Sequence, residues 1–362
     1  MNAVFFTGFP GFLGAELLPR LLARSPEQRA VCLVQSKFAE LARRRMIEIE
    51  DAHPALRDRI ELVEGDITRP GLGLEEGSSL AASVVEIFHL AAIYDLGVGR
   101  ATGMRVNVDG TRHMLQFACN CPRLERFQYV STCYVSGTYA GVFSETDLAR
   151  GQGFHNFYEE TKYLAEVEVQ RRMYDGLPVT IYRPAIVVGD SKTGSTQKYD
   201  GPYSVFRFLL RQPRLAVLPS MGDPTRTEVN LVPRDFVMDA IVFLSGRPES
   251  KNQVYQLADP HPLTVAKIVQ EMARATGRKV LRIPAPFRPV KWMLAHVPPV
   301  EWLVGIPPDT MDYFVHPGRY ATQKTQAALQ AGGIHCPRFP EYAGRLVEFM
   351  RAHPEVGAAA MA

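Results

Sequence analysis

Short apolar runs alternate with stretches of helical spacing along the first half of the chain. Helices are expected over residues 12–24, near 108–118 and over 158–174, where apolar positions recur every three or four residues. Strands that alternate with helices imply βαβ crossovers and a parallel sheet covered on both faces. The pattern therefore predicts an α/β fold with a doubly wound parallel sheet, which binds ligands beyond the carboxyl ends of its strands. The expected strands are residues 3–7, 30–34, 60–63, 84–91, 127–131 and 179–182.

The rhythm changes after Pro184. Residues 190–230 are rich in Gly, Pro and Ser around one apolar helix, and Asp235 is expected to be the N-cap of a later helix. We therefore expect a smaller, mostly helical part toward the C-terminus. The later elements are expected at residues 203–210 (helix), 236–244 (helix), 254–257 (strand) and 265–275 (helix). The expected division is residues 1–188 with 230–260 returning to them, against residues 189–229 and 261–362.

Composition narrows the class of partner. The 41 Lys and Arg residues nearly balance the 38 Asp and Glu residues, which argues against nucleic acid, because counterion release needs a concentrated basic face. The five cysteines follow no zinc or redox spacing, so we expect reduced thiols and no metal. The N-terminal segment lacks a basic leader, and no window of about 18 uninterrupted apolar residues exists. These features predict a cytoplasmic protein.

A glycine-rich turn joins the first expected strand to the first expected helix. Gly8, Gly11 and Gly14 fall at intervals of three. Without side chains, such a turn lets backbone N–H groups approach a pyrophosphate at a helix N-terminus. A tight turn that binds nothing is the alternative, but the position between a strand and a helix favours a dinucleotide. The residues expected to contact it here are Thr7, Gly8, Phe9, Pro10, Gly11, Phe12, Leu13 and Gly14.

The end of the second strand bears on the choice between NAD and NADP. It carries no carboxylate before Glu40, whereas Lys37, helped by Arg43 or Arg44, could meet a 2′-phosphate. A solvated lysine is the alternative; we favour NADP(H) over NAD(H). Asp66 ends the third strand, where its carboxylate could reach the adenine amino group or only shape a turn. Small residues close the fourth strand and leave room for the cofactor or serve packing alone: Ala91 and Ala92.

Tyr158 and Lys162 lie four residues apart in a strongly helical segment, so their side chains share one face. A free tyrosine titrates at about 10, and an ammonium one turn away lowers that value by favouring the phenolate. The same lysine can bond the cofactor ribose. Tyr158 would then protonate a carbonyl oxygen while hydride reaches the carbon, and a hydroxyl from the end of the fifth strand, Ser131 or Thr132, could polarise the same carbonyl. An exposed helical pair is the alternative.

These residues resemble the extended short-chain dehydrogenase/reductases over roughly residues 3–275. The match includes the glycine turn, residues 107–111, and Arg183 with Pro184. In that family the hydroxyl residue lies five positions before a glycine, here Gly137. The resemblance thus implies a Rossmann fold and a catalytic triad of Thr132, Tyr158 and Lys162. It also implies cofactor contacts from Ile67, Asn107, Tyr158, Lys162, Pro184 and Ile186.

Within that superfamily the chain is most similar to the fatty acyl-CoA reductases and to the thioester reductase domains of carboxylic acid reductases. The similarity implies an NADPH-dependent reductase of a hydrophobic acyl thioester, on coenzyme A or an acyl carrier protein, or of the derived fatty aldehyde. Because the first strand starts at the N-terminus, we expect a carrier-bound substrate to arrive on a separate protein. The resemblance also allows a homodimer. The phrases that carry it are residues 65–74, 88–92, 130–132, 156–158 and 232–236.

The apolar second part suits a hydrophobic substrate. Residues 284–308 could instead lie on a membrane surface, but their prolines interrupt any long amphipathic helix. Side chains that could line a substrate channel, or belong to an ordinary core, are Tyr203, Phe206, Phe208, Leu209, Trp292, Trp302 and Phe314. Cations that could meet the phosphates of coenzyme A or a phosphopantetheine arm, or simply face solvent, are Arg207, Arg211, Arg214 and Arg226.

Other functions stay open at this point. A dehydrogenase or ketoreductase for a hydrophobic secondary alcohol, of sterol or β-hydroxy acid type, fits the same residues. A nucleotide-sugar epimerase or dehydratase fits less well, because the second part is apolar. A non-catalytic NAD(P)-sensing regulator would need no triad, so the intact triad argues against it.

Overall fold

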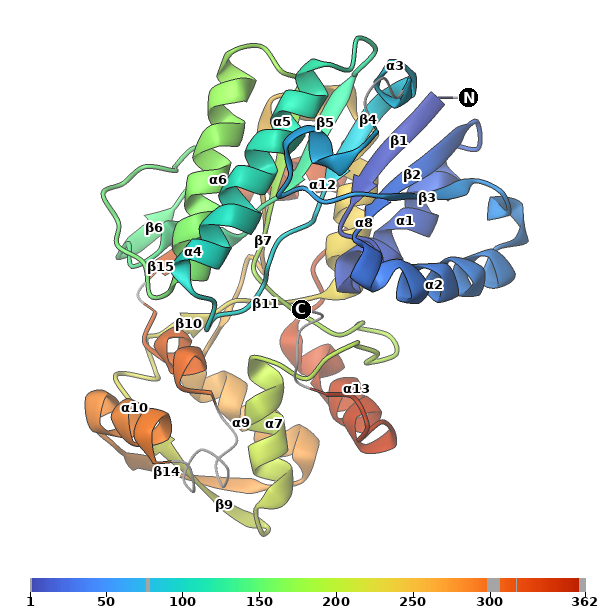
Figure 1. Ribbon diagram of the computed structural model, residues 1–362. Coiled ribbons are helices and arrows are strands. Elements are labelled where there is room, and N and C mark those ends of the chain that lie inside the picture. Colours follow the sequence, from blue (N-terminus) through green and yellow to red (C-terminus); the bar gives the residue numbers. More distant parts are fainter. Residues whose placement is uncertain (1, 76–78, 298–306, 317, 358–362) are drawn as a thin grey trace.

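The computed structural model describes residues 2–75, 79–297, 307–316 and 318–357. Its largest unit is a seven-stranded sheet with the order β12-β7-β5-β4-β1-β2-β3, in which all neighbouring strands are parallel (Figure 1). This confirms the predicted doubly wound parallel sheet. The strands are β1 Asn2–Thr7, β2 Gln28–Val34, β3 Ile60–Glu64, β4 Val84–His89, β5 Arg126–Val130, β7 Val179–Pro184 and β12 Gln253–Leu257.

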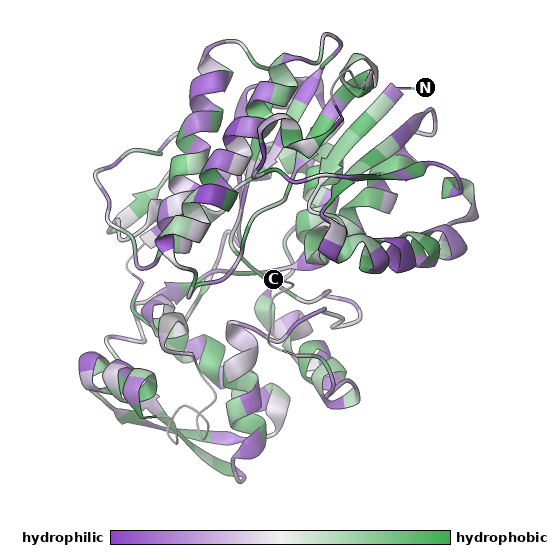
Figure 2. Cartoon of the chain, in the orientation of Figure 1, coloured by the Kyte–Doolittle hydropathy of each residue, from purple (hydrophilic) through white to green (hydrophobic). Residues whose placement is uncertain are grey.

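Two helical layers cover this sheet, and successive residues of β1 serve opposite layers. Phe5 packs into the core beneath α5 and α6, whereas Phe6 packs into the core beneath α1 and α8. Because both faces are covered, the central strands are buried along most of their length and mostly apolar, and Figure 2 shows them largely green. The helices of these layers are α1 Phe12–Arg24, α2 Ala39–Ala52, α5 Gly110–Cys119, α6 Phe157–Tyr174, α8 Arg234–Ser245 and α12 Gln323–Gln330.

A smaller domain lies beyond the carboxyl ends of these strands, below the sheet in Figure 1. Its apolar core joins α7, α9 and α13 to the inner side of a two-stranded parallel ribbon, β9–β14. The elements of this domain are α7 Pro202–Arg211, β9 Leu215–Ser220, α9 Val265–Thr276, β14 Lys279–Pro284, α10 Phe287–His296, the 3₁₀-helix η7 Pro308–Phe314 and α13 Phe339–Ala352.

Shorter elements lie between these longer helices and strands. They are η1 Ser36–Phe38, η2 Pro54–Leu56, η3 Pro70–Gly73, α3 Leu80–Ser83, α4 Arg100–Gly103, the π-helix η4 Met104–Asp109, η5 Cys133–Ser136, β6 Gly141–Phe143, β8 Ile186–Val188, β10 Glu228–Val229, β11 Leu231–Pro233, η6 Pro248–Ser250, β13 Leu263–Thr264 and β15 Gly318–Tyr320. Among the described helices, none combines the length and the apolar character needed to span a bilayer.

Two expectations about the second half differ from the structure. The N-cap assignment of Asp235 is wrong, since α8 begins at Arg234 after Pro233. The Asp235 carboxylate instead accepts hydrogen bonds from the backbone and hydroxyl of Ser191, at 2.8 and 2.6 Å. Residues 318–334, expected in the smaller part, lie against the large domain, because β15 pairs with β6 and Leu329 of α12 enters the core beneath α8.

Candidate active site

The turn between β1 and α1 requires its glycines. Gly8 has a φ of +96°, and a Cβ there would lie 2.8 Å from the Cβ of Leu90 and 2.9 Å from the amide nitrogen of Ala91. A Cβ on Gly14 would come within 2.4 Å of the carbonyl oxygen of Gly8. The turn therefore lies directly against the segment that follows β4, and any side chain would separate them.

The N-terminus of α1 is open to an anion. Its N-cap is Gly11, which offers no side-chain hydrogen bond, and the first turn carries no acidic residue. The first N–H groups of a helix lack internal partners and lie at the positive end of the helix dipole. The cradle that a Cβ would fill and the uncapped helix start together fit the pyrophosphate of a dinucleotide.

A buried polar chain holds the carboxyl ends of β1 and β4 together. The Thr7 hydroxyl lies 2.8 Å from Nδ1 of His89 and accepts a hydrogen bond from the amide of Ala91 at 3.2 Å. Nε2 of His89 lies 3.0 Å from the hydroxyl of Thr111. Burial, with a smaller effect of Lys162, lowers the pKa of His89 to about 3, so this imidazole is neutral. Sequence reasoning did not identify His89 as a supporting residue, although it belongs to the 88–92 phrase that carries the family resemblance.

The predicted adenosine end contains a carboxylate that sequence reasoning missed. Lys37 is exposed, with its ammonium 4.8 Å from the ring of Phe38. The neighbouring Ser36 hydroxyl donates to Glu64, at the end of β3, at 2.5 Å. Asp66 is occupied locally: burial raises its pKa, but hydrogen bonds led by that from Thr68 outweigh burial and lower it. A cation and a carboxylate thus share the predicted ribose region.

Thr132 and Tyr158 come together at the carboxyl end of β5. Both side chains are buried, at 6% and 7% exposure. Burial raises the pKa of Tyr158, the hydroxyl of Thr132 opposes that rise, and the charge of Glu159 adds to it. The neighbouring hydroxyl, that of Ser131, donates instead to Glu166 at 2.5 Å.

Lys162 lies on the same face of α6 as Tyr158, but its ammonium bonds to other groups. Its ammonium donates to the hydroxyl of Tyr129 at 3.1 Å and to the carbonyl of Val130 at 2.9 Å. Burial lowers the pKa of Lys162 to about 8, and Glu166 opposes that fall. Lys162 is therefore not among the groups that shift the pKa of Tyr158, contrary to the expected lowering. Burial has the largest effect on that pKa.

A buried ion pair supports this part of α6. Arg183 and Glu166 are both fully buried, with Nη2 2.6 Å from Oε1, and Nη2 also donates to the carbonyl of Asp147 at 2.8 Å. Glu166 lies one turn after Lys162. Because the pair joins β7 to α6, it fixes the helix that carries Tyr158 against the sheet.

Asn107 and Pro184 take part in hydrogen bonds that join the segments around the predicted cofactor site. The Asn107 side chain accepts from the amide of Ile93 at 2.9 Å and donates to the hydroxyl of Thr161 at 3.0 Å. It therefore ties the segment after β4 to α6. The carbonyl of Pro184 accepts from the hydroxyl of Thr132 at 3.4 Å. Ile67 is buried against the α5 side of the sheet, and Ile186 opens β8.

The small domain contacts the start of α6 through η7 and the residues after it. The side-chain amide of Asn156, the N-cap of α6, donates to the hydroxyl of Tyr313 at 3.2 Å. Nδ1 of His155 lies 3.0 Å from Glu159, and its ring lies 5.6 Å from that of His316. Glu159 Oε1 and His316 Nδ1 are buried without a hydrogen-bond partner. Sequence reasoning missed this cluster because its members are far apart in the chain.

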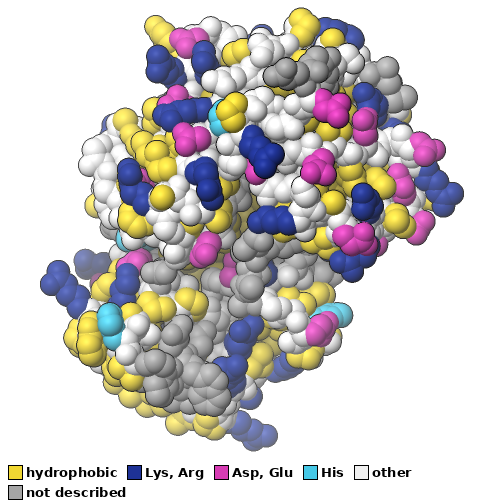
Figure 3. All heavy atoms as spheres, in the orientation of Figure 1, with side chains coloured by type: hydrophobic (Ala, Val, Ile, Leu, Met, Phe, Trp, Pro, Cys, Tyr) yellow, Lys and Arg dark blue, Asp and Glu magenta, His cyan; other side chains and the backbone are white. Residues whose placement is uncertain are grey.

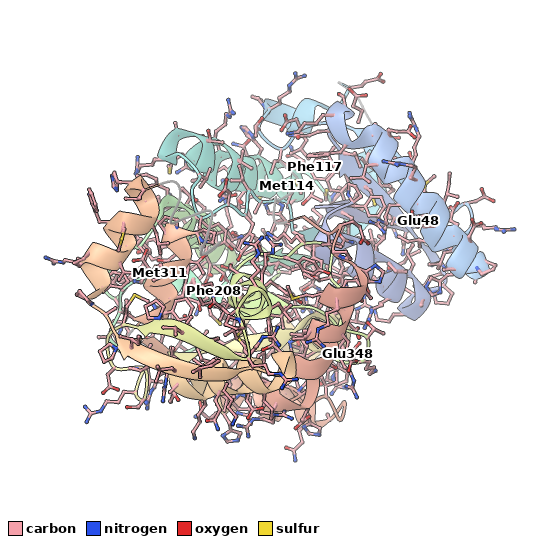
Figure 4. All side chains as sticks on the ribbon, turned by 90° about the horizontal axis from the view of Figure 1, so that it is seen from below. Glu48, Met114, Phe117, Phe208, Met311 and Glu348 are labelled. Carbon is pink, nitrogen blue, oxygen red and sulfur yellow. The ribbon has the colours of Figure 1, made fainter. Side chains whose placement is uncertain are left out.

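The predicted substrate channel is only partly correct. Four of its residues, Tyr203, Phe206, Phe208 and Leu209, are buried core side chains of α7. Phe314 does line an apolar cavity of about 220 Å³, Trp292 is 60% exposed, and Trp302 lies outside the described residues. Met311 lines the same cavity as Phe314. Figure 4 shows Met311 and the core residue Phe208 between the ribbon and the large domain.

Three of the arginines that could meet phosphates lie on α7 and in the turn after it, and the fourth lies in a later loop. Arg207 lies 6.0 Å from the ring of Tyr199, and Arg226 is exposed and pairs with Asp223 at 3.4 Å. Arg211 and Arg214 flank the turn between α7 and β9, exposed to solvent. Within the described ranges, no group of three or more His, Cys, Asp or Glu side chains could hold a metal ion.

Comparison with known proteins gives one family. A family model described as "Male sterility protein" matches residues 6–241. The crystal structure of the terminal R domain from the myxalamid PKS-NRPS biosynthetic pathway is 28% identical, with a TM-score of 0.83 over 98% of this chain and 91% of that one. The reductase (R) domain of a nonribosomal peptide synthetase from Mycobacterium tuberculosis is 24% identical, with a TM-score of 0.72 over 98% and 92% of the two chains, and shows the shared fold.

The similar curated proteins are much longer. A linear gramicidin synthase chain of Brevibacillus parabrevis is 28% identical over 94% of this chain and 7% of its own length. The large subunit of L-2-aminoadipate reductase of Penicillium chrysogenum is 27% identical over 90% of this chain and 23% of its own. The non-canonical nonribosomal peptide synthetase cpsA of Aspergillus campestris (strain IBT 28561) is 30% identical over 70% of this chain and 25% of its own. The chain thus spans about a quarter or less of these relatives.

Proposed function

Because the chain belongs to the Male sterility protein family and is an NAD(P)-dependent oxidoreductase of the extended short-chain dehydrogenase/reductase type, we propose that it reduces a hydrophobic acyl thioester with NADPH. The thioester is carried by coenzyme A or by a carrier protein, and the derived aldehyde is a second substrate. The observation that carries this proposal is the buried pair of hydroxyls, Thr132 and Tyr158, at the carboxyl end of β5. Relatives named as a reductase domain and as an aminoadipate reductase support it.

The residues divide the work as follows. Thr132 donates a hydrogen bond to the thioester carbonyl and polarises it. Tyr158 remains a neutral phenol at neutral pH, because burial raises its pKa, so it can give its proton to the oxygen as negative charge develops there. The bound dinucleotide supplies the hydride. Loss of the thiol from the reduced carbon then yields an aldehyde.

Lys162 and the glycine turn hold the reactants in this proposal. The Lys162 ammonium, 4% exposed and fixed by Tyr129 and Val130, is available to the cofactor ribose beside Tyr158. The turn at Gly8 and the start of α1 hold the pyrophosphate. Burial of the triad excludes water, which strengthens each of these polar interactions.

The test is cofactor oxidation with matched substrates. We expect NADPH oxidation, followed by its absorbance, with long-chain acyl thioesters and with fatty aldehydes. Only the thioesters should release a thiol, with one NADPH oxidised per thiol if reduction stops at the aldehyde and two if the aldehyde is reduced further. Tyr158→Phe should lower turnover by about 10²–10⁴-fold while cofactor binding, measured by fluorescence titration, is retained. Turnover confined to hydrophobic ketones would refute thioester reduction, and unchanged turnover in Tyr158→Phe would refute the role of the phenol.

A further inference from the structure

The β9–β14 ribbon presents an apolar face to solvent. Val217 pairs with Leu281 in parallel register, and the residues two positions before and after alternate to the same side. Leu215, Val217, Leu281 and Ile283 on this outer side are between 42% and 56% exposed. Ala216, which points the other way, is fully buried. The ribbon therefore has one side in the core and an aliphatic side in water.

Exposed apolar side chains concentrate in this part of the molecule. Helix α10 adds Trp292 at 60% and Met293 at 40% exposure. Half of the large apolar side chains that are exposed in the described structure belong to β9, β14 and α10 alone. Scattered exposed apolar residues need no explanation, but the four on the outer side of the ribbon are contiguous, and a contiguous set marks an interaction surface.

The same segments carry cations and no carboxylate. Residues 202–222 and 277–297 contain only Lys and Arg as charged residues, although the whole chain is nearly balanced, with a net charge of +3. Figure 3 shows dark blue and yellow side chains together along the lower margin of the small domain. Cations of these segments that are exposed and have no acidic partner among the described residues are Arg211, Arg214, Lys279, Arg282 and Arg288.

An apolar cavity lies directly behind this face. Leu218 of β9 and Leu294 of α10 line it, together with Met311 of η7. Arg282 belongs both to the cavity lining and to the exposed cations, so it lies at the rim. Only the thickness of the ribbon and of α10 separates the aliphatic outer face from the cavity.

We propose that this basic, aliphatic face docks on an anionic lipid surface. Aliphatic and Trp side chains enter the boundary between headgroups and acyl chains, while each exposed cation adds roughly fivefold to the affinity for an anionic leaflet. An acidic protein would attract the same cations. The aliphatic side chains next to an apolar cavity favour lipid, because an apolar chain leaving the bilayer would meet the cavity rim. The docking does not depend on the reaction proposed above.

Vesicle co-sedimentation of the whole chain tests this proposal. We expect sedimentation with vesicles of phosphatidylcholine and phosphatidylserine, none with phosphatidylcholine alone, and release at high salt. The double variant Arg214→Glu/Lys279→Glu, at the end of the ribbon, should weaken binding at least tenfold. Leu281→Ser/Ile283→Ser should weaken it as well.

The matched control reverses two exposed cations of the large domain, Arg247→Glu/Lys251→Glu, which should leave binding unchanged. Circular dichroism of each variant verifies folding. Equal sedimentation with both vesicle types, or an equal loss in the control, would overturn the proposal. So would a wild-type chain that does not bind vesicles but binds immobilised polyglutamate through Arg214 and Lys279, since the face would then recognise an acidic protein.

Discussion

The ammonium of Lys162 lies 3.1 Å from the hydroxyl of Tyr129, on the strand beneath α6. Burial lowers the pKa of Lys162 to about 8, so the ammonium persists below that pH and is lost above it. We therefore expect activity to fall as the pH rises past about 8. The measurement is kcat/KM against pH from about 6 to about 10. Lys162→Arg, which stays charged, should remove the fall, whereas a profile that is flat in the wild type would contradict the assignment.

The Arg183–Glu166 pair should control stability. Glu166→Ala leaves the fully buried guanidinium without its carboxylate, which costs about 3–5 kcal/mol of unfolding free energy. The control is Glu168→Ala on the same helix, where the pair with Arg112 is partly exposed and contributes less than about 1 kcal/mol. Urea unfolding followed by circular dichroism measures both. Equal losses in the two variants would refute the special weight of the buried pair.

Lys37 and Glu64 should have opposite effects on cofactor choice. A 2′-phosphate near Lys37 would gain from the ammonium and lose from the carboxylate that Ser36 contacts. We expect Lys37→Ala to weaken NADPH binding roughly tenfold with little change for NADH, and Glu64→Gln to strengthen NADPH binding. Titration of each variant with NADPH and with NADH measures both affinities. An equal loss of affinity for NADPH and NADH in Lys37→Ala would show that Lys37 does not contact the 2′-phosphate.

His155 should make stability depend on pH. Burial lowers the pKa of His155, but the hydrogen bond and charge of Glu159 outweigh burial and raise it. Asp312 adds to the rise and Lys291 opposes it. The ring of His316 also faces that of His155. A raised pKa stabilises the fold fully below the ordinary value and ceases to do so as pH rises through the folded value. We expect the wild type to lose roughly 1 kcal/mol more than His155→Gln between about pH 6 and about pH 8.5. Urea unfolding at both values measures this, and parallel losses would exclude the histidine.

Local pattern predicted the sheet, because strand alternation is a short-range property, whereas the pairing of Thr132 with Tyr158 follows from the family resemblance. The partner of Lys162 could not be predicted, since Tyr129 reaches it only through packing of α6 on β5. The β9–β14 ribbon joins segments more than sixty residues apart, and nothing in either run marks the pairing. For Phe208 the sequence left a channel and an ordinary core both open, because apolar side chains look alike in sequence whether they line a channel or fill a core.

Helix η7 contacts both the apolar cavity and the N-cap residue of α6. Met311 and Phe314 form part of the cavity wall, while Tyr313 between them accepts the hydrogen bond from the cap of α6. An apolar substrate chain that enters the cavity and displaces this short helix should also displace the first turn of α6, the helix that bears Tyr158. The length of the substrate chain should therefore alter the rate of proton transfer from Tyr158 as well as the affinity. Substrates whose chains fit the cavity poorly would then have a low kcat, not only a high KM.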